Sequence, residues 1–210
     1  MEKKISCILF LLFFLIGIFG ITINNNNMEF TFNNENKLTS FSNLIDKRMN
    51  HSFIQSPSQE ICVWNLKVVT EKQIYLLGCN QSEIQQERMK DKLILRWNNI
   101  KFEEDTKSIS IIVEINLEEN SILSQWNLTT EFGTSGISLW SIEFPILAIS
   151  PQKGNKENTF LASSSVMGKL YEHPFTYLGS FKTIYPSADQ SMQFLSYYEN
   201  CKNEFFFFIL

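Results

Sequence analysis

Residues 108–117 alternate between apolar and mostly polar side chains, and this pattern constrains the fold more than any other stretch of the chain. The apolar positions are Ile109, Ile111, Val113, Ile115 and Leu117. A period of two over ten residues is typical of a β-strand with one face on a core. Residues 121–128 and 137–144 repeat the pattern more briefly. The sequence therefore predicts an all-β fold, an antiparallel β-sandwich spanning about residues 28–200.

Polar turns between apolar runs predict where the chain reverses. Residues 28–33 and 38–44 are expected to form one hairpin, and residues 61–69 and 74–79 another. Shorter strands are expected at 92–97 and 159–162. The one helical window is 82–90, where good helix formers follow Ser82, and Gln85 stands at the spacing of a capping box.

The N-terminus has the composition of a targeting segment. Lys3 and Lys4 precede an apolar run from Ile5 to Phe19, which Gly20 closes. This order predicts a secretory signal peptide over residues 1–20. The alternative is an uncleaved membrane anchor, because extending the run to Ile23 makes it just long enough to span a bilayer. Residues 21–27, which include the Asn tract, are expected to be a spacer outside the sandwich.

Secretion would allow disulfide bonds. Cys62 and Cys79 lie in the two strands of one predicted hairpin, on the same face if the register aligns them. A Cys62–Cys79 disulfide is therefore predicted, and two buried free thiols are the alternative. Cys201 is left without a partner.

Three Asn-x-Ser/Thr triplets are candidate glycosylation sites in a secreted chain, at Asn50, Asn80 and Asn127. Asn127 is the weakest candidate, because its neighbours Trp126 and Leu128 have the pattern of buried residues.

Charge and motifs argue against several classes of function. The net charge is −4 and no basic cluster is present, so nucleic acid is not an expected partner. His51 and His173 are far apart and no metal-ligand spacing occurs, so neither a metal nor a cofactor is predicted. No catalytic residue is assigned either. The acidic residues that could serve glycoside hydrolysis are interpreted as surface charges: Glu131, Glu143, Glu172 and Asp189.

Aromatic residues supply the candidate binding site. An indole or phenol ring can stack on the apolar face of a sugar ring, whereas a Trp at an alternating strand position is more often part of the core. The candidate carbohydrate contacts are Trp140, Tyr177 and Tyr185.

Three segments come in an order that resembles a known family. They are Gln125–Leu128, Gly136–Leu147 and Tyr185–Phe194. Together they resemble the N-terminal β-sandwich of large secreted glycoside-hydrolase-like proteins, a domain with the galactose-mutarotase-like supersandwich architecture that precedes a catalytic (β/α)8 barrel. The resemblance extends over about residues 28–198. It implies a domain without catalytic residues of its own, since the family's acid and nucleophile belong to the barrel.

The C-terminus departs from that family. After Tyr198 the chain continues for 12 residues and ends in the apolar run 205–210. We interpret residues 201–210 as an atypical tail, with a truncated gene product favoured over an added last strand, and expect the tail to promote self-association.

Three functions remain open from the sequence. The first is a secreted, non-catalytic sandwich domain with weak carbohydrate binding. The second is an accessory domain that docks to a glycosidase barrel encoded elsewhere. The third is a structural or adhesion protein tethered to a membrane through residues 5–23.

Overall fold

The computed structural model describes residues 20–35, 38–48, 50–54, 61–149, 157–165, 168–177, 190–199 and 204–209. The chain divides into two compact units, residues 1–149 and 150–210. In both, the described strands pair antiparallel. The fold is thus all-β, as predicted, but it is not the single domain of residues 28–200.

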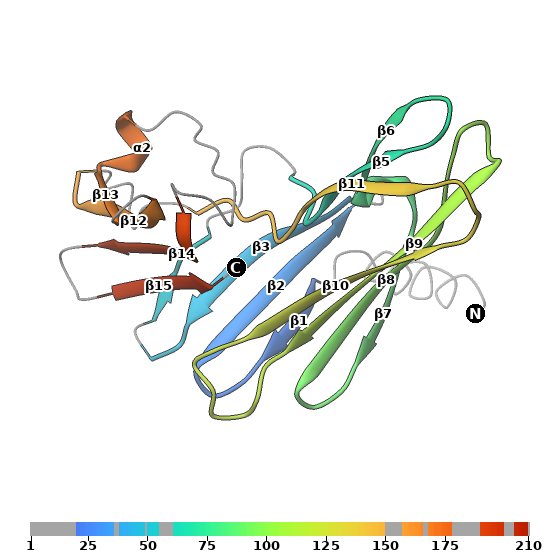
Figure 1. The fold of residues 1–210 in the computed structure, drawn as a ribbon. Helices are drawn as coiled ribbons and strands as arrows, with labels where there is room; N and C mark the ends of the chain where they lie inside the picture. Colours follow the sequence, from blue (N-terminus) through green and yellow to red (C-terminus); the bar gives the residue numbers. More distant parts are fainter. Residues whose placement is uncertain are drawn as a thin grey trace, which may run out of the picture. The chain divides into compact units, whose positions relative to one another are not determined.

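The first unit contains three sheets (Figure 1). The first has the order β1-β2-β3-β4: Ile21–Asn24, Met28–Glu35, Leu38–Asp46 and His51–Ser52. The second has the order β10-β9-β8-β7: Gln125–Phe132, Lys107–Asn116, Lys92–Phe102 and Ile84–Arg88. The third has the order β11-β5-β6: Ser138–Glu143, Asn65–Val69 and Ile74–Gly78. A 3₁₀ turn, η1, covers Cys79–Gln81.

Strand β9 confirms the alternation that led the sequence analysis. The apolar side chains that it directs to one face are completely buried: Ile109, Ile111, Val113 and Ile115. The partner strand β10 places Trp126 opposite Ile115 and Leu128 opposite Val113. Both therefore face the same interior.

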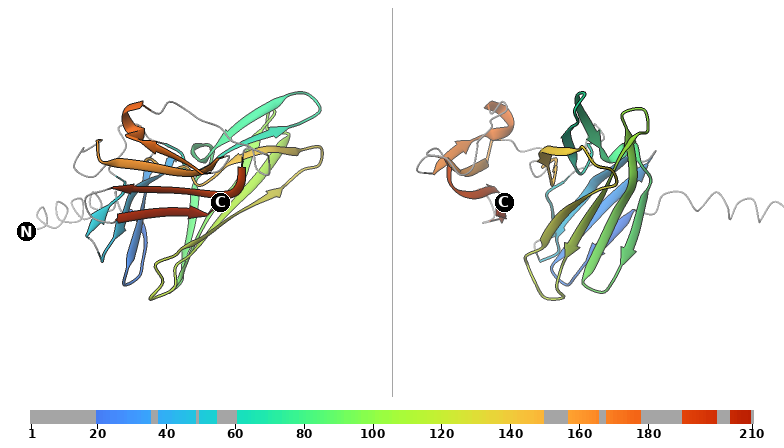
Figure 2. Two further views of the ribbon diagram at one scale, coloured as in Figure 1. Left: turned by 60° about the vertical axis from the view of Figure 1, so that its left-hand side comes forward. Right: turned by 45° about the vertical axis from the view of Figure 1, so that its right-hand side comes forward.

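Two of the sheets lie face to face in a sandwich (Figure 2), and aromatic contacts join them. The Trp126 ring lies 5.4 Å from that of Phe30 and 5.0 Å from that of Phe41, which belong to the β1–β4 sheet. Two further indoles, those of Trp64 and Trp97, meet edge to face with their ring centroids 5.5 Å apart. Stacked sheets bury their facing side chains in this way.

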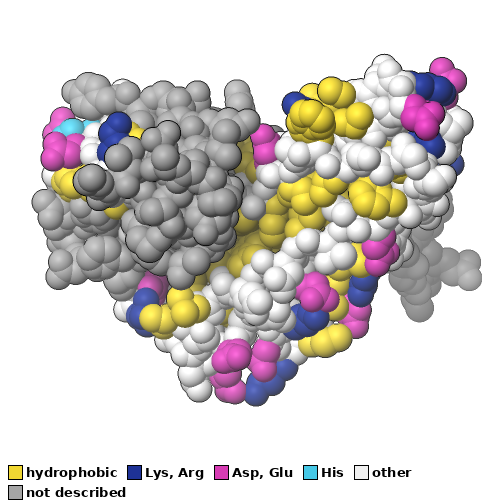
Figure 3. Space-filling view, in the orientation of Figure 1, with side chains coloured by type: hydrophobic (Ala, Val, Ile, Leu, Met, Phe, Trp, Pro, Cys, Tyr) yellow, Lys and Arg dark blue, Asp and Glu magenta, His cyan; other side chains and the backbone are white. Residues whose placement is uncertain are grey.

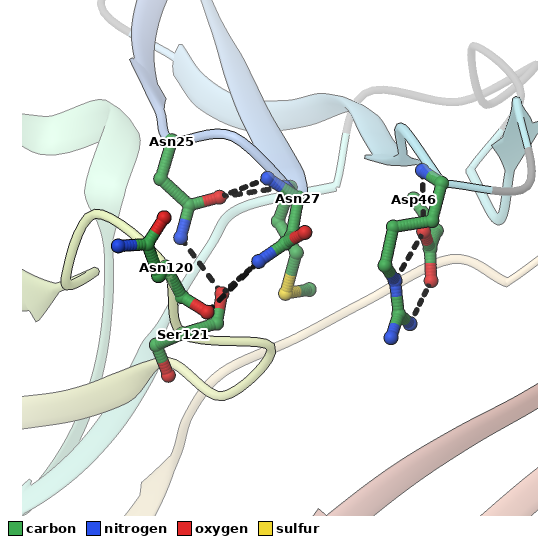
Figure 4. A network of polar contacts seen from close by, with 7 residues as sticks. Asn25, Asn27, Asp46, Asn120 and Ser121 are labelled. Atoms are coloured by element: carbon green, nitrogen blue, oxygen red, sulfur yellow. Dashed lines mark hydrogen bonds and ion pairs between the residues drawn. The ribbon is translucent and has the colours of Figure 1, made fainter.

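The Asn tract is part of the fold, which corrects the expectation of a spacer at residues 21–27. Ile21 and Ile23 of β1 are buried, and the strand pairs with β2. The side chain of Asn25 makes the turn that follows (Figure 4): its Oδ1 accepts from the amides of Asn27 and Met28 at 2.8 and 2.7 Å.

The same turn binds a distant loop. Asn25 Nδ2 donates to the Ser121 carbonyl at 2.8 Å, and Asn27 Nδ2 donates to the Asn120 carbonyl at 2.9 Å (Figure 4). Asn25 Nδ2 also donates to the Glu118 carbonyl at 2.6 Å. Asn26 adds a single bond between side chains, to Asn120. Asn25 thus connects the β1–β2 turn to the loop between β9 and β10.

The predicted helix at 82–90 is wrong. Residues 84–88 form β7, an edge strand in which Glu87 pairs with Ile94 of β8. Ser82 does not cap a helix, because its hydroxyl hydrogen bonds to the carbonyl of Asn98 at 3.0 Å. Long polar side chains favour a helix only weakly, and pairing with a buried neighbour overrides that preference.

The second unit is a four-stranded sheet with the order β13-β12-β14-β15. Its elements in chain order are β12 Thr159–Ser165, β13 Lys169–Glu172, the four-residue helix α2 Pro174–Tyr177, β14 Gln190–Glu199 and β15 Glu204–Ile209. Strand β15 pairs with β14 from Glu204 opposite Glu199 to Ile209 opposite Phe194. The apolar run interpreted as a tail is therefore largely a strand, the reading that the sequence analysis did not favour.

Two predictions for the N-terminus have different outcomes. Residues 1–19, where a signal or anchor helix was expected, lie outside the described residues. The extension of an anchor to Ile23 is wrong, since Ile21 and Ile23 belong to β1. In the described part of the chain, no helix is long and apolar enough to cross a membrane.

Replacing Asn25 by Ala should destabilise the first unit. The change removes four side-chain hydrogen bonds and should lower the free energy of unfolding by about 1–3 kcal/mol. Asn26→Ala is the matched control, with an expected effect under about 0.5 kcal/mol. Urea unfolding followed by intrinsic tryptophan fluorescence measures both, and equal effects would contradict the assigned role of Asn25.

Deleting residues 204–210 should increase self-association. The deletion removes β15 and leaves β14 as an unpaired edge, which templates pairing between copies. Light scattering of the full chain and the deletion variant measures this. Deleting Leu210 alone leaves β15 whole and serves as the control. A deletion variant that associates less than the full chain would support the original tail interpretation.

Candidate functional site

Trp140 is the one predicted carbohydrate contact whose side chain the structure describes. It lies on β11, an edge of the three-stranded sheet, and is 69% exposed. Trp64 and Trp97 are fully buried, and Trp126 is half-buried. Trp140 is therefore the tryptophan of this chain that is free to meet a ligand from solvent.

A β-bulge explains the exposure of Trp140. Strand β11 pairs with β5 through Leu139 opposite Val68 and Ser141 opposite Lys67, so Trp140 is the extra residue between two pairs. A bulge commonly redirects a side chain at a sheet edge. Simple alternation over residues 137–144 would place residues 140, 142 and 144 on one face, but the bulge between Leu139 and Ser141 interrupts that alternation.

The connection before β11 is firmly held. Gly133 donates its amide to the Ser108 carbonyl at 3.0 Å, and a Cβ at this position would lie 2.3 Å from Ser108 Oγ. Lys107 Nζ donates to the Ser135 carbonyl at 2.6 Å, and Gly136 adopts a positive φ of 71°. Only glycine fits easily at both positions. This loop fixes how the chain leaves β10 and enters the strand that carries Trp140.

The surroundings of Trp140 combine apolar and polar groups. Leu139 and Ile142 on the same strand are 38% and 41% exposed. At the end of β11, Glu143 accepts a hydrogen bond of 3.2 Å from Asn65 Nδ2 of β5. Hydrophobic side chains gather on the visible face of the first unit around β11 (Figure 3). An exposed indole on a strand that also carries polar side chains is suited to stacking on a sugar ring.

The other two predicted contacts are not brought to this surface by any described contact. Tyr177 is the last residue of α2, in the second unit, and its side chain lies outside the described residues, as does all of Tyr185. The predicted site is thus represented by Trp140 alone.

The acidic residues form no described catalytic pair. Glu131 lies on β10 and Glu143 on β11, two strands that do not pair with each other; Glu172 lies in the second unit, and Asp189 is outside the described residues. Within the described ranges no group of three or more His, Cys, Asp or Glu residues could hold a metal ion. Two buried carboxylates that the sequence did not single out have ion-pair partners: Glu103 lies 3.2 Å from Lys72 Nζ, and Asp46 pairs with Arg48.

Cys62 and Cys79 are both free thiols in the structure. Cys62 precedes β5 and Cys79 begins η1 directly after β6. A Cβ on Gly78, the residue before Cys79, would lie 3.4 Å from Cys62 Sγ, so both cysteines lie at the same end of the hairpin. The disulfide itself stays a prediction. Cys201 lies outside the described residues.

All three predicted glycosylation sites have exposed Asn side chains. Asn50 precedes β4, Asn80 lies in η1, and Asn127 is on the outer face of β10 opposite Glu114. Asn127 was expected to be the weakest site because of its apolar neighbours. Strand alternation turns those neighbours inward and Asn127 outward, so that reason does not hold.

Comparison with known proteins shows a distant likeness among solved structures. No protein-family model and no curated protein matches the chain. Among solved structures, a galactose mutarotase related enzyme from Lactobacillus acidophilus is similar, with 13% identity over 87% of this chain and 74% of that one and a TM-score of 0.49. At this level of similarity, the account of the fold depends on the chain's own strands and contacts.

Proposed function

We propose that this chain is a secreted, non-catalytic β-domain that binds carbohydrate through Trp140. The observation that carries the proposal is the 69% exposed indole, held out at a bulge on an edge strand of an otherwise well-packed unit. Large aromatic side chains left exposed beside polar groups commonly mark a binding surface. The resemblance of residues 28–198 to the first domain of glycosidase-type proteins points to the same class of ligand.

Secretion is the second part of the proposal. It is supported by the basic and then apolar order of residues 3–19, followed by the first strand at Ile21. Cleavage after Gly20 would leave β1 intact, whereas cleavage beyond Ile23 would remove buried residues of the core.

A second candidate function is docking to a catalytic barrel carried by another chain. Apolar side chains on β10 and β11 favour it, since Phe132 is 44% exposed in addition to Leu139 and Ile142. Exposed apolar side chains on edge strands are suited to a protein partner. Co-purification of a barrel-bearing protein from the native source would favour this function over binding of free carbohydrate.

Replacing Trp140 by Ala should weaken carbohydrate binding at least tenfold, which is about 1.4 kcal/mol. Affinity electrophoresis in gels containing soluble glucan, galactan, xylan or mannan measures the effect. Leu76→Ala is the matched control, because Leu76 is 73% exposed on β6, the opposite edge of the same sheet. Retardation that is equal in wild type and both variants would contradict the site, and no retardation in any gel would contradict binding of these polysaccharides.

Cleavage of the signal should give a mature chain that begins at Ile21. Expression in a secreting eukaryotic host, followed by N-terminal sequencing of the protein from the medium, measures this. The control is Gly20→Leu, which should impair cleavage because signal peptidase requires a small residue before the cut. Retention of residues 1–20 on the membrane-bound wild-type chain would instead support a tether.

A further inference from the structure

Two cysteines meet at one end of the β5–β6 hairpin. The last pair of that hairpin joins Asn65 to Gly78, and the chain continues beyond it to Cys79 on one side and back to Cys62 on the other. A Cβ at Gly78 would lie 3.4 Å from Cys62 Sγ, so the sulfur of Cys62 packs against the hairpin end next to Cys79. The hairpin register thus brings together two thiols separated by 16 residues.

The two thiols differ in access to solvent. Cys79 is fully buried and its sulfur donates to the carbonyl of Thr39 at 3.1 Å, a carbonyl that also accepts from the amide of Val63. Cys62 is only half-buried. A reagent arriving from solvent therefore meets Cys62 first.

Hydrogen bonds make the exposed thiol the more acidic one. The Cys79 side chain, and to a smaller extent the backbone amides of Asn80 and Cys79, lower the pKa of Cys62 to about 7 against the opposing effect of burial. The same hydrogen bond and burial raise the pKa of Cys79 far above its usual value. At neutral pH Cys62 is therefore more often the nucleophilic thiolate than an ordinary cysteine is, while Cys79 stays protonated.

We propose that Cys62 and Cys79 form a redox-active dithiol site, in which Cys62 attacks an incoming organic disulfide and Cys79 then closes the Cys62–Cys79 bond. In the first step the Cys62 thiolate bonds to one sulfur of the reagent and the other sulfur leaves as a thiolate. In the second step Cys79 loses its proton to solvent and attacks Cys62 Sγ, releasing the second thiolate. The protein loses two electrons and two protons, and the reagent disulfide is reduced to two thiols.

This site is independent of carbohydrate binding. The sequence predicted only a Cys62–Cys79 disulfide. The proposed site adds that the less buried Cys62 reacts first and Cys79 second. Structural cysteines in apolar surroundings are inert, whereas a partly exposed thiol with donors around its sulfur reacts readily. The arrangement of Cys62 is of the second kind.

The test uses the full chain carrying Cys7→Ser and Cys201→Ser, so that only the pair can react. The probe is the aromatic disulfide 5,5′-dithiobis(2-nitrobenzoate), which releases a coloured thiolate at each step. The parent chain should release two equivalents and end as an intramolecular disulfide, which mass spectrometry of a non-reduced digest identifies. A product that carries two mixed disulfides would overturn the proposal.

Single variants assign the order of attack. Cys79→Ser should release one equivalent and stop at a mixed disulfide on Cys62, whereas Cys62→Ser should react at least about tenfold more slowly at neutral pH. Equal rates for the two variants would refute the assigned order. In concentrated guanidinium chloride the two variants should react at the same rate, and a difference that persists there would show that the folded structure is not its cause.

The pH profile gives an independent readout. The initial rate for the parent chain should fall with decreasing pH around a midpoint near 7, because the thiolate is the attacking form. A midpoint at about 8.5, the value of an ordinary cysteine, would contradict the hydrogen-bonded environment of Cys62. Far-UV circular dichroism of each variant confirms that the reacting protein is folded.

Discussion

The packing of Trp126 against the aromatic residues of the facing sheet holds the first unit together. The indole comes from β10 and contacts Phe30, Phe32 and Phe41, so it joins the β10-β9-β8-β7 sheet to the β1-β2-β3-β4 sheet. It depends on β9, whose buried face sets the register that turns Trp126 inward. The ring also lies 6.2 Å from Phe144, which directly follows β11. The strand that carries the proposed site is thus attached to the same aromatic cluster.

Periodicity predicted the parts of the fold in which burial determines conformation. Apolar alternation and polar turns predicted strand β9 and the hairpins β2–β3 and β5–β6. A strand that is buried on one face has alternating apolar and polar residues, which can be recognised in the sequence. Strand β7 was not found, because only Ile84 of its five side chains is even half-buried and the strand has no apolar alternation of its own. Its backbone pairs with the buried strand β8. Pairing with β8 determines the conformation of β7, and the sequence pattern of residues 84–88 does not reveal that pairing.

The Asn-rich composition of residues 24–27 led to a wrong prediction, because this segment has a specific structural role. The residues 24–27 looked like a spacer because four Asn residues in a row carry no periodicity. In the structure Asn25 accepts two turn amides and donates to two carbonyls of a loop more than 90 residues away. An Asn side chain offers both an acceptor and two donors, so it satisfies a turn and a loop at once. The apolar run 205–210 was misinterpreted for a related reason: its residues 205–209 belong to β15, and a short stretch of sequence does not reveal the pairing of β15 with β14.

The candidate site was only partly predictable for the same physical reason. Trp140 could be named as a sugar-contact candidate, but strand alternation assigned it to the same face as Ile142, and the bulge that exposes it arises from pairing with β5. The surroundings of Cys62 were equally hidden, because they also arise from strand pairing. Asn65 pairs with Gly78 at the end of the β5–β6 hairpin, and a Cβ on Gly78 would lie 3.4 Å from Cys62 Sγ. The small sheet β11-β5-β6 therefore carries an exposed aromatic residue at one edge and a reactive thiol at one hairpin end, and both positions are determined by pairing with β5 or β6.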